Sequence, residues 1–361
     1  MSWVRGIDAN KERFEISGRL IGSGFPTYIV AELSANHNQD FEHAVDLVKK
    51  AKGIGADAVK LQTYTPDTLT IQSDAPEFHI GGGTPWDGRT LYDLYAEAHM
   101  PWEWQPELKK VADDLGLDFF STPFDKTAVD YLEEMSIPAY KVASPEIIDI
   151  PLIEYIASKG KPIVMSTGMA TLSEIDEAVR AARRAGASEI ALLKCTSAYP
   201  APPEEMNLST IPHLAEAFGL PVGLSDHTLD IAVPVVAVAL GACIIEKHFT
   251  LSRSAPSPDS AFSLEPPEFK TMVEAIRTAE RALGTVQYKV TEQEAKSRVF
   301  RRSLYVVSDM EKGEEFTDEN VRSIRPGNGL HPRYLKEVLG KRAANDIKRG
   351  MPLSWRLISG K

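Results

Sequence analysis

The stretch at residues 222–250 decides the fold. It contains GLSDHT at residues 223–228 and, after an interval with helical character, IIEKHFT at residues 244–250. Each histidine follows a short apolar run that is typical of a buried strand. A lone histidine in such a place is more often structural, but two at matching places in consecutive strand–helix units favour one shared divalent metal. The sequence therefore predicts that His227 and His248 bind one metal ion.

Apolar runs like these recur along the chain, and amphipathic helices separate most of them. One helix face is formed by Ala44, Leu47, Val48 and Ala51. Strands that alternate with helices in this way predict an α/β fold of the (β/α)8 TIM barrel type. An open doubly wound sheet is the competing fold, but no G-x-G-x-x-G sequence follows the first run. The eight runs occupy residues 27–32, 58–62, 118–121, 139–142, 163–165, 190–194, 222–224 and 243–246.

Two domains are predicted. Residues 1–285 comprise a β-hairpin lead-in followed by the barrel, and residues 286–299 form a polar linker. Residues 300–358 form a small, mostly β domain with strands at 304–307 and 321–324. The apolar positions of the lead-in are Phe14, Ile16 and Leu20.

One connection, at residues 65–100, is long for a barrel loop and contains Pro66, Trp86, Tyr92 and Tyr95. Such loops often close over active sites. An ordinary insertion, packed by its own aromatic residues, is the alternative interpretation.

The charge of the chain is negative and unevenly distributed. The net charge of −11 over 361 residues argues against a nucleic-acid partner. Residues 296–361 contain 15 basic and 8 acidic residues, so this end carries +7 and the remainder carries −18. Two solvated surfaces are one interpretation. The other is that a basic tail domain folds against an acidic body, its own or a neighbour's.

The cysteines and the hydropathy of the chain indicate a compartment. Cys195 and Cys243 lie in apolar, strand-like runs, which is typical of buried thiols in a reducing environment. No signal peptide begins the sequence, and no apolar run approaches the length of a membrane span. We therefore expect a cytoplasmic, soluble protein with no membrane partner.

Polar residues follow the apolar runs at the predicted strand ends, where TIM barrels carry their chemistry. Lys60 and Lys141, together with several hydroxyl groups, suit a small phosphorylated anion, and the Ser166-Thr167-Gly168 turn adds backbone N–H donors. Each hydroxyl could instead cap a helix, and each lysine could lie along the barrel rim. The strand-end residues are Glu32, Ser34, Asn36, His37, Lys60, Gln62, Ser121, Thr122, Lys141, Ser144, Ser166, Thr167, Thr196, Ser197, Tyr199, Ser225, Asp226, His227, Glu246 and His248.

At these residues the chain resembles the sialic acid synthase family. The tail resembles the antifreeze-like SAF domain of that family, through RRSL at residues 301–304 and RPGNG at residues 325–329. The resemblance covers about residues 15–358, with the motifs in the family's order. In the barrel the matching strings are AELSANH (31–37), VKLQT (59–63), STPF (121–124), YKVAS (140–144), STGM (166–169), SDHT (225–228) and EKHFT (246–250).

Further strings resemble one branch of the family, whose sugar is 2,4-diacetamido-2,4,6-trideoxy-L-altrose. Sialic acid synthases usually have an asparagine near the position of Ser197, and its absence here favours this branch. The family commonly has Gly-Gly-Pro-Asp where this chain has PSPD at residues 256–259, but the aspartate, Asp259, is retained. The branch strings are LQTYTPDT (61–68), WDG (86–88), TLY (90–92), PWEW (101–104), CTSAYP (195–200) and DSAFS (259–263).

The resemblance implies a reaction and roles for the strand-end residues. The family condenses phosphoenolpyruvate with an N-acetylated amino sugar, giving a nine-carbon nonulosonic acid and phosphate. His227 and His248 would hold the divalent metal, Mn²⁺ or Mg²⁺ with Co²⁺ as a further option, and would count with Glu32 and Asp259 as the catalytic residues. Phosphoenolpyruvate would bind to Lys60, Thr122, Lys141, Ser144, Ser166, Ser197 and Ser225. The sugar would bind to Gln62, Tyr199, Asp259 and Arg325.

The family also implies a homodimer with exchanged tail domains, in which Arg325 reaches the partner's site.

Several alternatives remain open at this point. N-acetylneuraminate and legionaminic acid synthases differ only in the sugar, and a silent sugar-binding or scaffold protein would lack turnover. A phosphoenolpyruvate-dependent enzyme for sugar phosphates would need a second basic pocket, and no cluster of arginines at the strand ends supplies one.

Overall fold

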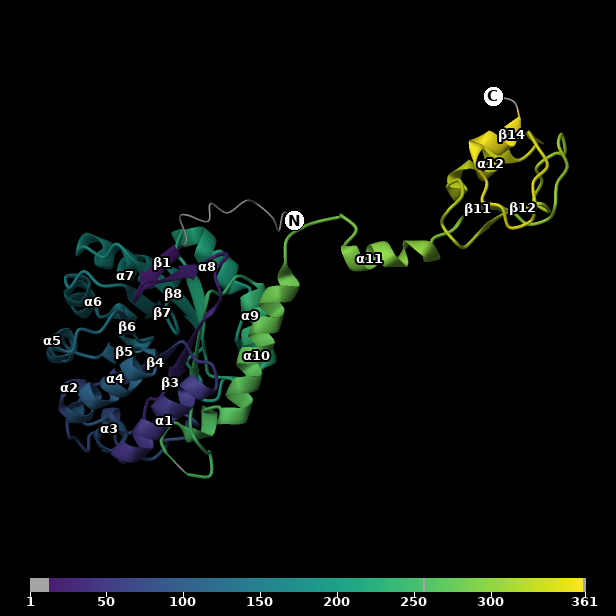
Figure 1. The fold of residues 1–361 in the computed structure, drawn as a ribbon. Helices are drawn as coiled ribbons and strands as arrows, with labels where there is room; N and C mark the ends of the chain where they lie inside the picture. The colour runs from purple at the N-terminus through teal and green to yellow at the C-terminus, as the bar shows by residue number, and fades with distance from the viewer. Residues whose placement is uncertain (1–12, 256, 360–361) are drawn as a thin grey trace. The chain divides into compact units, whose positions relative to one another are not determined.

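The computed structural model describes residues 13–255 and 257–359, which belong to two compact units, residues 1–284 and 285–361 (Figure 1). The first 12 residues of the predicted lead-in lie outside the described part. Within the described residues, no helix is long and apolar enough to cross a membrane. Each unit is treated separately below.

The first unit is a closed barrel of parallel strands, which confirms the predicted TIM-barrel fold (Figure 1). Neighbouring strands follow the order β10-β3-β4-β5-β6-β7-β8-β9, so the first and last strands of the series close the barrel. The strands are β3 (Tyr28–Glu32), β4 (Ala58–Thr63), β5 (Asp118–Pro123), β6 (Tyr140–Val142), β7 (Ile163–Ser166), β8 (Ile190–Cys195), β9 (Val222–Asp226) and β10 (Ile244–His248).

Helices surround the barrel and bury one apolar face each against the strands. The predicted face of the first helix is confirmed, because Ala44, Leu47, Val48 and Ala51 are all buried. Polar side chains begin several of these helices by accepting a free backbone N–H, such as Asp40, which accepts from His43. The helices are α1 (Phe41–Gly53), α4 (Gln105–Asp114), α5 (Lys126–Glu134), α6 (Ile150–Ala157), α7 (Leu172–Arg184), α8 (Thr210–Phe218), α9 (Ala232–Ala239) and α10 (Pro266–Leu283).

A β-hairpin covers the end of the barrel where the strands begin. Its strands are β1 (Arg13–Ile16) and β2 (Arg19–Gly22). Phe14, Ile16 and Ile21 belong to one buried cluster with barrel residues near the strand starts, such as Tyr28 and Ala58. The apolar face therefore includes Ile21, because Leu20, the predicted position, is only half-buried. The catalytic machinery must lie at the opposite end, where the strands finish.

At that opposite end, the long connection after β4 contains its own short elements. They are α2 (Pro66–Leu69), a 3₁₀ turn at Pro76–Phe78 and α3 (Leu91–Ala98), and Thr90 caps α3 by accepting the Asp93 N–H.

The second unit is small, with a core of its own around Leu304, Val306, Phe316 and Val321. Its sheets are two-stranded and antiparallel, and the second predicted strand coincides with β12. Helix α11 lies within the stretch predicted as a linker. The elements are α11 (Glu292–Lys296), β11 (Ser303–Val306), β12 (Val321–Ile324), α12 (Leu335–Val338), β13 (Arg342–Ala343) and β14 (Ile358–Ser359).

Candidate active site

Side chains at the carboxyl ends of the barrel strands alternate between the interior and the helix layer. The register places Glu32 level with Lys60 on one neighbouring strand and with His248 on the other. Glu246 is level with Ser225. The barrel interior is therefore apolar near the strand starts and polar at the mouth, which is the cause of the apolar-then-polar order in the sequence.

Four charged side chains form a buried network at the mouth. Lys60 forms an ion pair with Glu32, and its Nζ lies 3.9 Å from Glu246 Oε1. Lys141 Nζ lies 3.8 Å from the same Glu246 oxygen. All four are buried, with exposures of 1–6%. The alternative that the lysines lie along the rim is therefore wrong, because both ammonium groups point into the barrel.

Burial and mutual attraction shift the pKa values of these groups. Burial raises the pKa of Glu32 to about 7, although Lys60 opposes the shift. Burial lowers the pKa of Lys141 despite the attraction of Glu246. At Lys60 the effect of burial is outweighed by Glu246 and Glu32, so its pKa is raised. Burial also opposes ionisation of Glu246, but Lys141 and Lys60 outweigh it and lower the pKa. Glu246 is therefore a counter-charge for the two lysines.

Hydroxyl groups surround the two ammonium groups. Lys141 Nζ donates to Ser166 Oγ at 2.7 Å, and Lys60 Nζ donates to Thr122 Oγ1 at 3.3 Å. Ser225 Oγ donates to Glu246 Oε1 at 3.1 Å. The hydroxyls of Ser166, Thr122 and Ser225 thus contact the charged network, which favours the predicted anion site over helix caps.

A second group of hydroxyls lies beside a glycine. Ser144 Oγ and Ser197 Oγ are buried and have no hydrogen-bond partner among the described residues. Ser144 starts the 3₁₀ turn Pro145–Ile148 without capping it. A Cβ atom on Gly168, whose φ is +28°, would overlap Ser144 and come 2.7 Å from Ser197 Oγ. Unpaired buried donors around a position that only glycine can occupy form a cradle for an anion.

The rings of the two predicted metal ligands lie next to each other. The ring centroids of His227 and His248 lie 5.4 Å apart. His227 Nδ1 contacts the Thr196 carbonyl oxygen at 2.9 Å, so Nδ1 donates its proton there and Nε2 is the nitrogen on the other side of the ring. His248 Nδ1 is buried and has no hydrogen-bond partner among the described residues. Asp259 Oδ2 is 3.9 Å from that nitrogen.

The protonation of these imidazoles suits a ligand role at His248. Burial, reinforced by His227 and Lys60, holds the pKa of His248 well below its usual value, so the ring is neutral. At His227 burial is outweighed by Cys195 and the Thr196 carbonyl, and the pKa is raised. Across residues 13–255 and 257–359, no cluster of three or more His, Cys, Asp or Glu side chains has metal-binding geometry. Two imidazoles with water or substrate oxygen as further ligands fit a divalent ion, and a closed structural zinc site does not fit.

Asp259 lies on the rim beside Glu32 despite the altered loop sequence that precedes it. Its carboxylate accepts from Ser34 Oγ and from the Ala35 N–H. Gln62 Nε2 bridges Ser34 Oγ (2.9 Å) and Glu32 Oε1 (3.2 Å). Burial raises the pKa of Asp259, although the Ser34 hydrogen bond opposes the shift. Two carboxyl groups of raised pKa thus border the histidine pair.

Three aromatic rings cover the histidines. Tyr199 lies over His227 with 4.4 Å between ring centroids, and Phe262 contacts both Tyr199 (4.9 Å) and His248 (4.9 Å). Trp86, from the long connection after β4, contacts Tyr199 at 5.6 Å. Its indole N–H donates to the Pro258 carbonyl at 2.9 Å. This contact favours the lid interpretation of residues 65–100 over an insertion packed only against itself.

Some strand-end residues are structural, and others were given no role. His37 contacts the Ala98 carbonyl and the edge of Trp104, so it fastens the long connection. Asn36 holds the Phe249 carbonyl. Glu146 was missed: its Oε2 is buried without a hydrogen-bond partner among the described residues, and burial raises its pKa to about 7 against the opposing attraction of Lys141. A signal for it is its place two residues after Ser144. Glu246, without a predicted role, is the counter-charge.

Arg325, the predicted sugar ligand of the tail, follows β12. It is exposed on the second unit, where its guanidinium lies 6.0 Å from the ring centre of Phe300. Its contact with the sugar stays a prediction.

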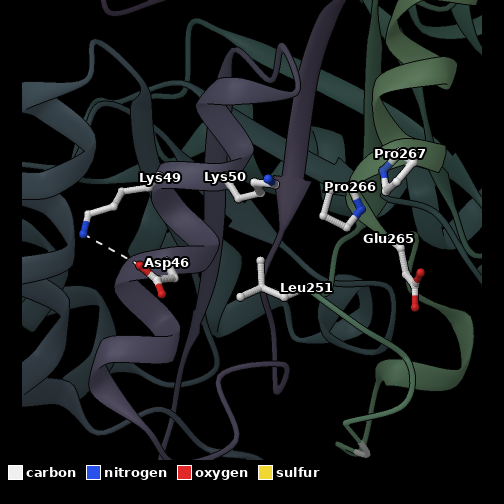
Figure 2. A pocket seen from close by; sticks show the side chains of 7 residues that line it. All are labelled: Asp46, Lys49, Lys50, Leu251, Glu265, Pro266 and Pro267. Carbon is white, nitrogen blue, oxygen red and sulfur yellow. Dashed lines mark ion pairs between the residues drawn. The ribbon is translucent and has the colours of Figure 1, made fainter.

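A separate surface pocket lies outside the barrel mouth (Figure 2). Asp46 and Lys49 form an ion pair at 3.7 Å on one side of it. None of its lining residues belongs to the polar network above. It is lined by Asp46, Lys49, Lys50, Leu251, Glu265, Pro266 and Pro267.

A TIM barrel with buried lysines, free hydroxyls and paired imidazoles at its mouth defines a class of anion-binding, metal-assisted enzymes. Comparison with known proteins gives the family. The NeuB family model matches residues 47–288, and the SAF domain model matches residues 301–358. The chain belongs to the NeuB family, which confirms the sialic acid synthase relationship and the C-terminal SAF domain predicted from the motifs.

Individual relatives agree with this assignment. A pseudaminic acid synthase of Campylobacter jejuni is 48% identical over 323 residues, covering 90% of this chain and 94% of that protein. An N,N'-diacetyllegionaminic acid synthase of Legionella pneumophila is 37% identical, covering 93% and 96%. The crystal structure of the spore coat polysaccharide biosynthesis protein spsE of Bacillus subtilis superimposes with a TM-score of 0.66 at 34% identity, covering 97% of this chain and 99% of that chain.

Proposed function

We propose that the chain acts as a pseudaminic acid synthase. It condenses phosphoenolpyruvate with 2,4-diacetamido-2,4,6-trideoxy-L-altrose and water, and it releases a nonulosonic acid and phosphate. The observation that carries this proposal is one barrel mouth with two buried ammonium groups, two hydroxyls without hydrogen-bond partners among the described residues, and two adjacent imidazoles. The 48% identity to a pseudaminic acid synthase, against 37% to a legionaminic acid synthase, favours the altrose derivative as the sugar.

Phosphoenolpyruvate binds between the lysines and the cradle. Lys60 and Lys141 supply two positive charges, and Glu246 balances them until the substrate arrives. Ser144 and Ser197 donate to the phosphate, since both hydroxyls lack partners among the described residues. Thr122, Ser166 and Ser225 complete the site. A low-dielectric interior strengthens each of these contacts.

His227 and His248 hold a divalent cation, for which Mn²⁺, Mg²⁺ and Co²⁺ are the candidates. When bound, this ion supplies Lewis-acid polarisation of the sugar's aldehyde oxygen. The neutral His248 ring is the form that such an ion requires, and at His227 Nε2 is the nitrogen that would bind it, because Nδ1 contacts the Thr196 carbonyl oxygen.

The remaining chemistry requires proton transfers. The C3 carbon of phosphoenolpyruvate attacks the open-chain aldehyde carbon, and the aldehyde oxygen takes up a proton. Water adds to the resulting oxocarbenium carbon and loses a proton, and phosphate then leaves by cleavage of its bond to carbon. Glu32 and Asp259 are the acid–base candidates, because their raised pKa values allow each to hold a proton near neutral pH.

The sugar lies against the aromatic rings and the rim. Tyr199 provides a flat surface beside His227, Asp259 lies 3.9 Å from His248 Nδ1, and Gln62 is joined to Asp259 through Ser34. Arg325 of a partner subunit contacts an acetamido group in a homodimer with exchanged tail domains. The +7 charge of the tail and the −18 charge of the rest of the chain support this pairing. A cytoplasmic location agrees with the burial of Cys195 and Cys243, which is typical of cysteines in a reducing compartment.

Parallel assays of phosphate release test the proposal. The purified protein is given phosphoenolpyruvate with the altrose derivative, with the legionaminic precursor and with N-acetylmannosamine. Turnover should be fastest with the altrose derivative; a preference for another sugar would move the protein to the corresponding branch. No turnover with any sugar would leave a silent binding protein.

The metal role needs its own test. His248→Ala should abolish both turnover and metal binding, whereas His213→Ala, at an exposed position of α8, should change neither. Wild-type protein should lose activity after exhaustive chelation and regain it with Mn²⁺. Full turnover of the chelated protein would contradict the metal role.

A further inference from the structure

A buried ion pair lies directly behind the two proposed metal ligands. Lys247 precedes His248 on β10, and Asp226 precedes His227 at the end of β9. Because successive strand residues face opposite sides, the two charged side chains lie on the outer side of the barrel wall. Both side chains have 0% exposure.

The pair makes its contacts with the two residues on either side of His227. Lys247 Nζ lies 2.7 Å from Asp226 Oδ2 and also donates to the Thr228 carbonyl oxygen. The other carboxylate oxygen, Asp226 Oδ1, accepts the Thr228 N–H at 2.9 Å. One ammonium group adjacent to His248 therefore holds both chain neighbours of His227. The same two strands are in register here, with Lys247 opposite Asp226.

Stability alone is a poor reason for such a pair. Burying two charges carries a desolvation cost, and apolar residues of similar volume often replace a buried pair without loss of stability. Directed hydrogen bonds, unlike apolar packing, fix the position of the backbone on both sides of His227. A shared ion needs both imidazole nitrogens within about 2.0–2.2 Å, so a small displacement of either strand end weakens binding.

We propose that Lys247 and Asp226 are positioning residues of the metal site, which set the distance between the imidazoles of His227 and His248. The inference rests on the proposed function, specifically on the metal role of the two histidines. Neither Lys247 nor Asp226 contacts the ion or the substrates; both act through the backbone of β9 and β10.

The test measures Mn²⁺ affinity without substrates, from the free-ion signal in electron paramagnetic resonance. Three variants are compared with the wild type: Lys247→Met, the isosteric Asp226→Asn, and the double variant Asp226→Leu with Lys247→Met. Arg277→Met is the matched control, because it removes an ion pair with Asp57 (3.2 Å) from the other end of the barrel. Melting temperature is recorded for the wild type and for every variant.

We expect the Mn²⁺ dissociation constant to rise about 10- to 100-fold in each pair variant, as for other groups that orient metal ligands. The control should lose stability and keep its affinity within twofold. In the double variant a melting temperature close to wild type with weak Mn²⁺ binding would separate positioning from stability. Lys247→Arg, which keeps the charge, should recover part of the affinity.

Affinity within twofold of wild type in Asp226→Asn and in the double variant would overturn the inference and leave the proposed function intact. Asp226→Asn, the mildest change, decides the question if the lysine variants do not fold. If wild-type protein and His248→Ala bind Mn²⁺ equally, the metal role itself fails, and the inference fails with it.

Discussion

The indole N–H of Trp86 donates a hydrogen bond to the carbonyl oxygen of Pro258, 172 residues further along the chain. The connection after β4 is thereby joined to the loop after β10, which carries Asp259. The Trp86 ring also contacts Tyr199, the residue that lies over His227. The Trp86 side chain thus connects the long connection after β4 to the loop after β10 and to the ring that covers His227.

Replacing Trp86 should weaken sugar binding in steps. Trp86→Phe keeps a ring against Tyr199 and loses one hydrogen bond, which is worth about 0.5–1.5 kcal/mol, so the sugar KM should rise severalfold. Trp86→Ala also loses the ring contacts, worth about 0.5–1.5 kcal/mol, and should raise the sugar KM more than tenfold. Steady-state kinetics should show the phosphoenolpyruvate KM within twofold in both. Equal effects on the two substrates would contradict a lid over the sugar.

Adding one methyl group to Gly168 should close the phosphate cradle. The Cβ of Gly168→Ala would overlap Ser144 and approach Ser197. Phosphoenolpyruvate affinity, measured by calorimetry, should fall at least tenfold. Gly160→Ala is the matched control, because it has a φ of +73° and no atom within 4 Å of a new Cβ. The control should lose about 1–2 kcal/mol of stability and keep its affinity. Unchanged binding by Gly168→Ala would place the phosphate elsewhere.

Removing the Glu246 charge should destabilise the empty protein. Glu246→Gln leaves Lys141 without its counter-charge, and breaking a buried pair costs about 3–5 kcal/mol. Saturating phosphoenolpyruvate should raise the melting temperature more in this variant than in wild type, because the substrate supplies the missing negative charge. Glu274→Gln, which breaks an exposed pair with Lys270 (3.9 Å), should behave like wild type. Equal ligand-induced shifts would show that Glu246 does not balance the lysines.

Glu146 should couple phosphoenolpyruvate binding to proton uptake. Burial raises its pKa to about 7, so the carboxyl is neutral below that pH and charged above it. A nearby anion raises this pKa further, so between pH 7 and 8 binding should take up protons, as measured by calorimetry in buffers of different ionisation enthalpy. Glu146→Gln should take up fewer protons, and the exposed Glu204→Gln should match wild type. Identical proton uptake in all three proteins would rule Glu146 out.

The second unit should contribute to sugar use. It has a separate core, so deleting residues 297–361 should leave the barrel folded. The truncated protein should show a higher sugar KM with phosphoenolpyruvate affinity nearly unchanged. Arg325→Ala should reproduce most of the effect, whereas Arg349→Ala, at another exposed position of this unit, should not. An unchanged sugar KM in the truncated protein would contradict the proposed role of the tail.

The apolar runs predict all eight barrel strands, and the differences lie at the strand ends. The seventh and eighth runs are predicted to end at Leu224 and Glu246, whereas β9 and β10 continue to Asp226 and His248. Hydropathy stops indicating a strand where side chains become polar. Backbone pairing does not stop there, because the polar side chains face the mouth while the strand hydrogen bonds continue.

Partners across the barrel are the part that sequence patterns do not reveal. Glu246 balances Lys60 and Lys141, which come from other strands, and only closure of the barrel brings the three together. Periodicity places His37 at a strand end as well as it places His248. His37 is nevertheless structural, because its partner is a carbonyl oxygen of the long connection.

The β1–β2 hairpin beneath the barrel determines the route by which substrates enter and products leave. Phe14, Ile16 and Ile21 seal the floor with apolar side chains, so both substrates and the water consumed must arrive through the upper opening. Phosphate and the nine-carbon acid must depart by the same route. Because there is one opening, the substrates must bind in a fixed order. Phosphoenolpyruvate, which binds deeper in the barrel, must enter before the sugar occupies the opening.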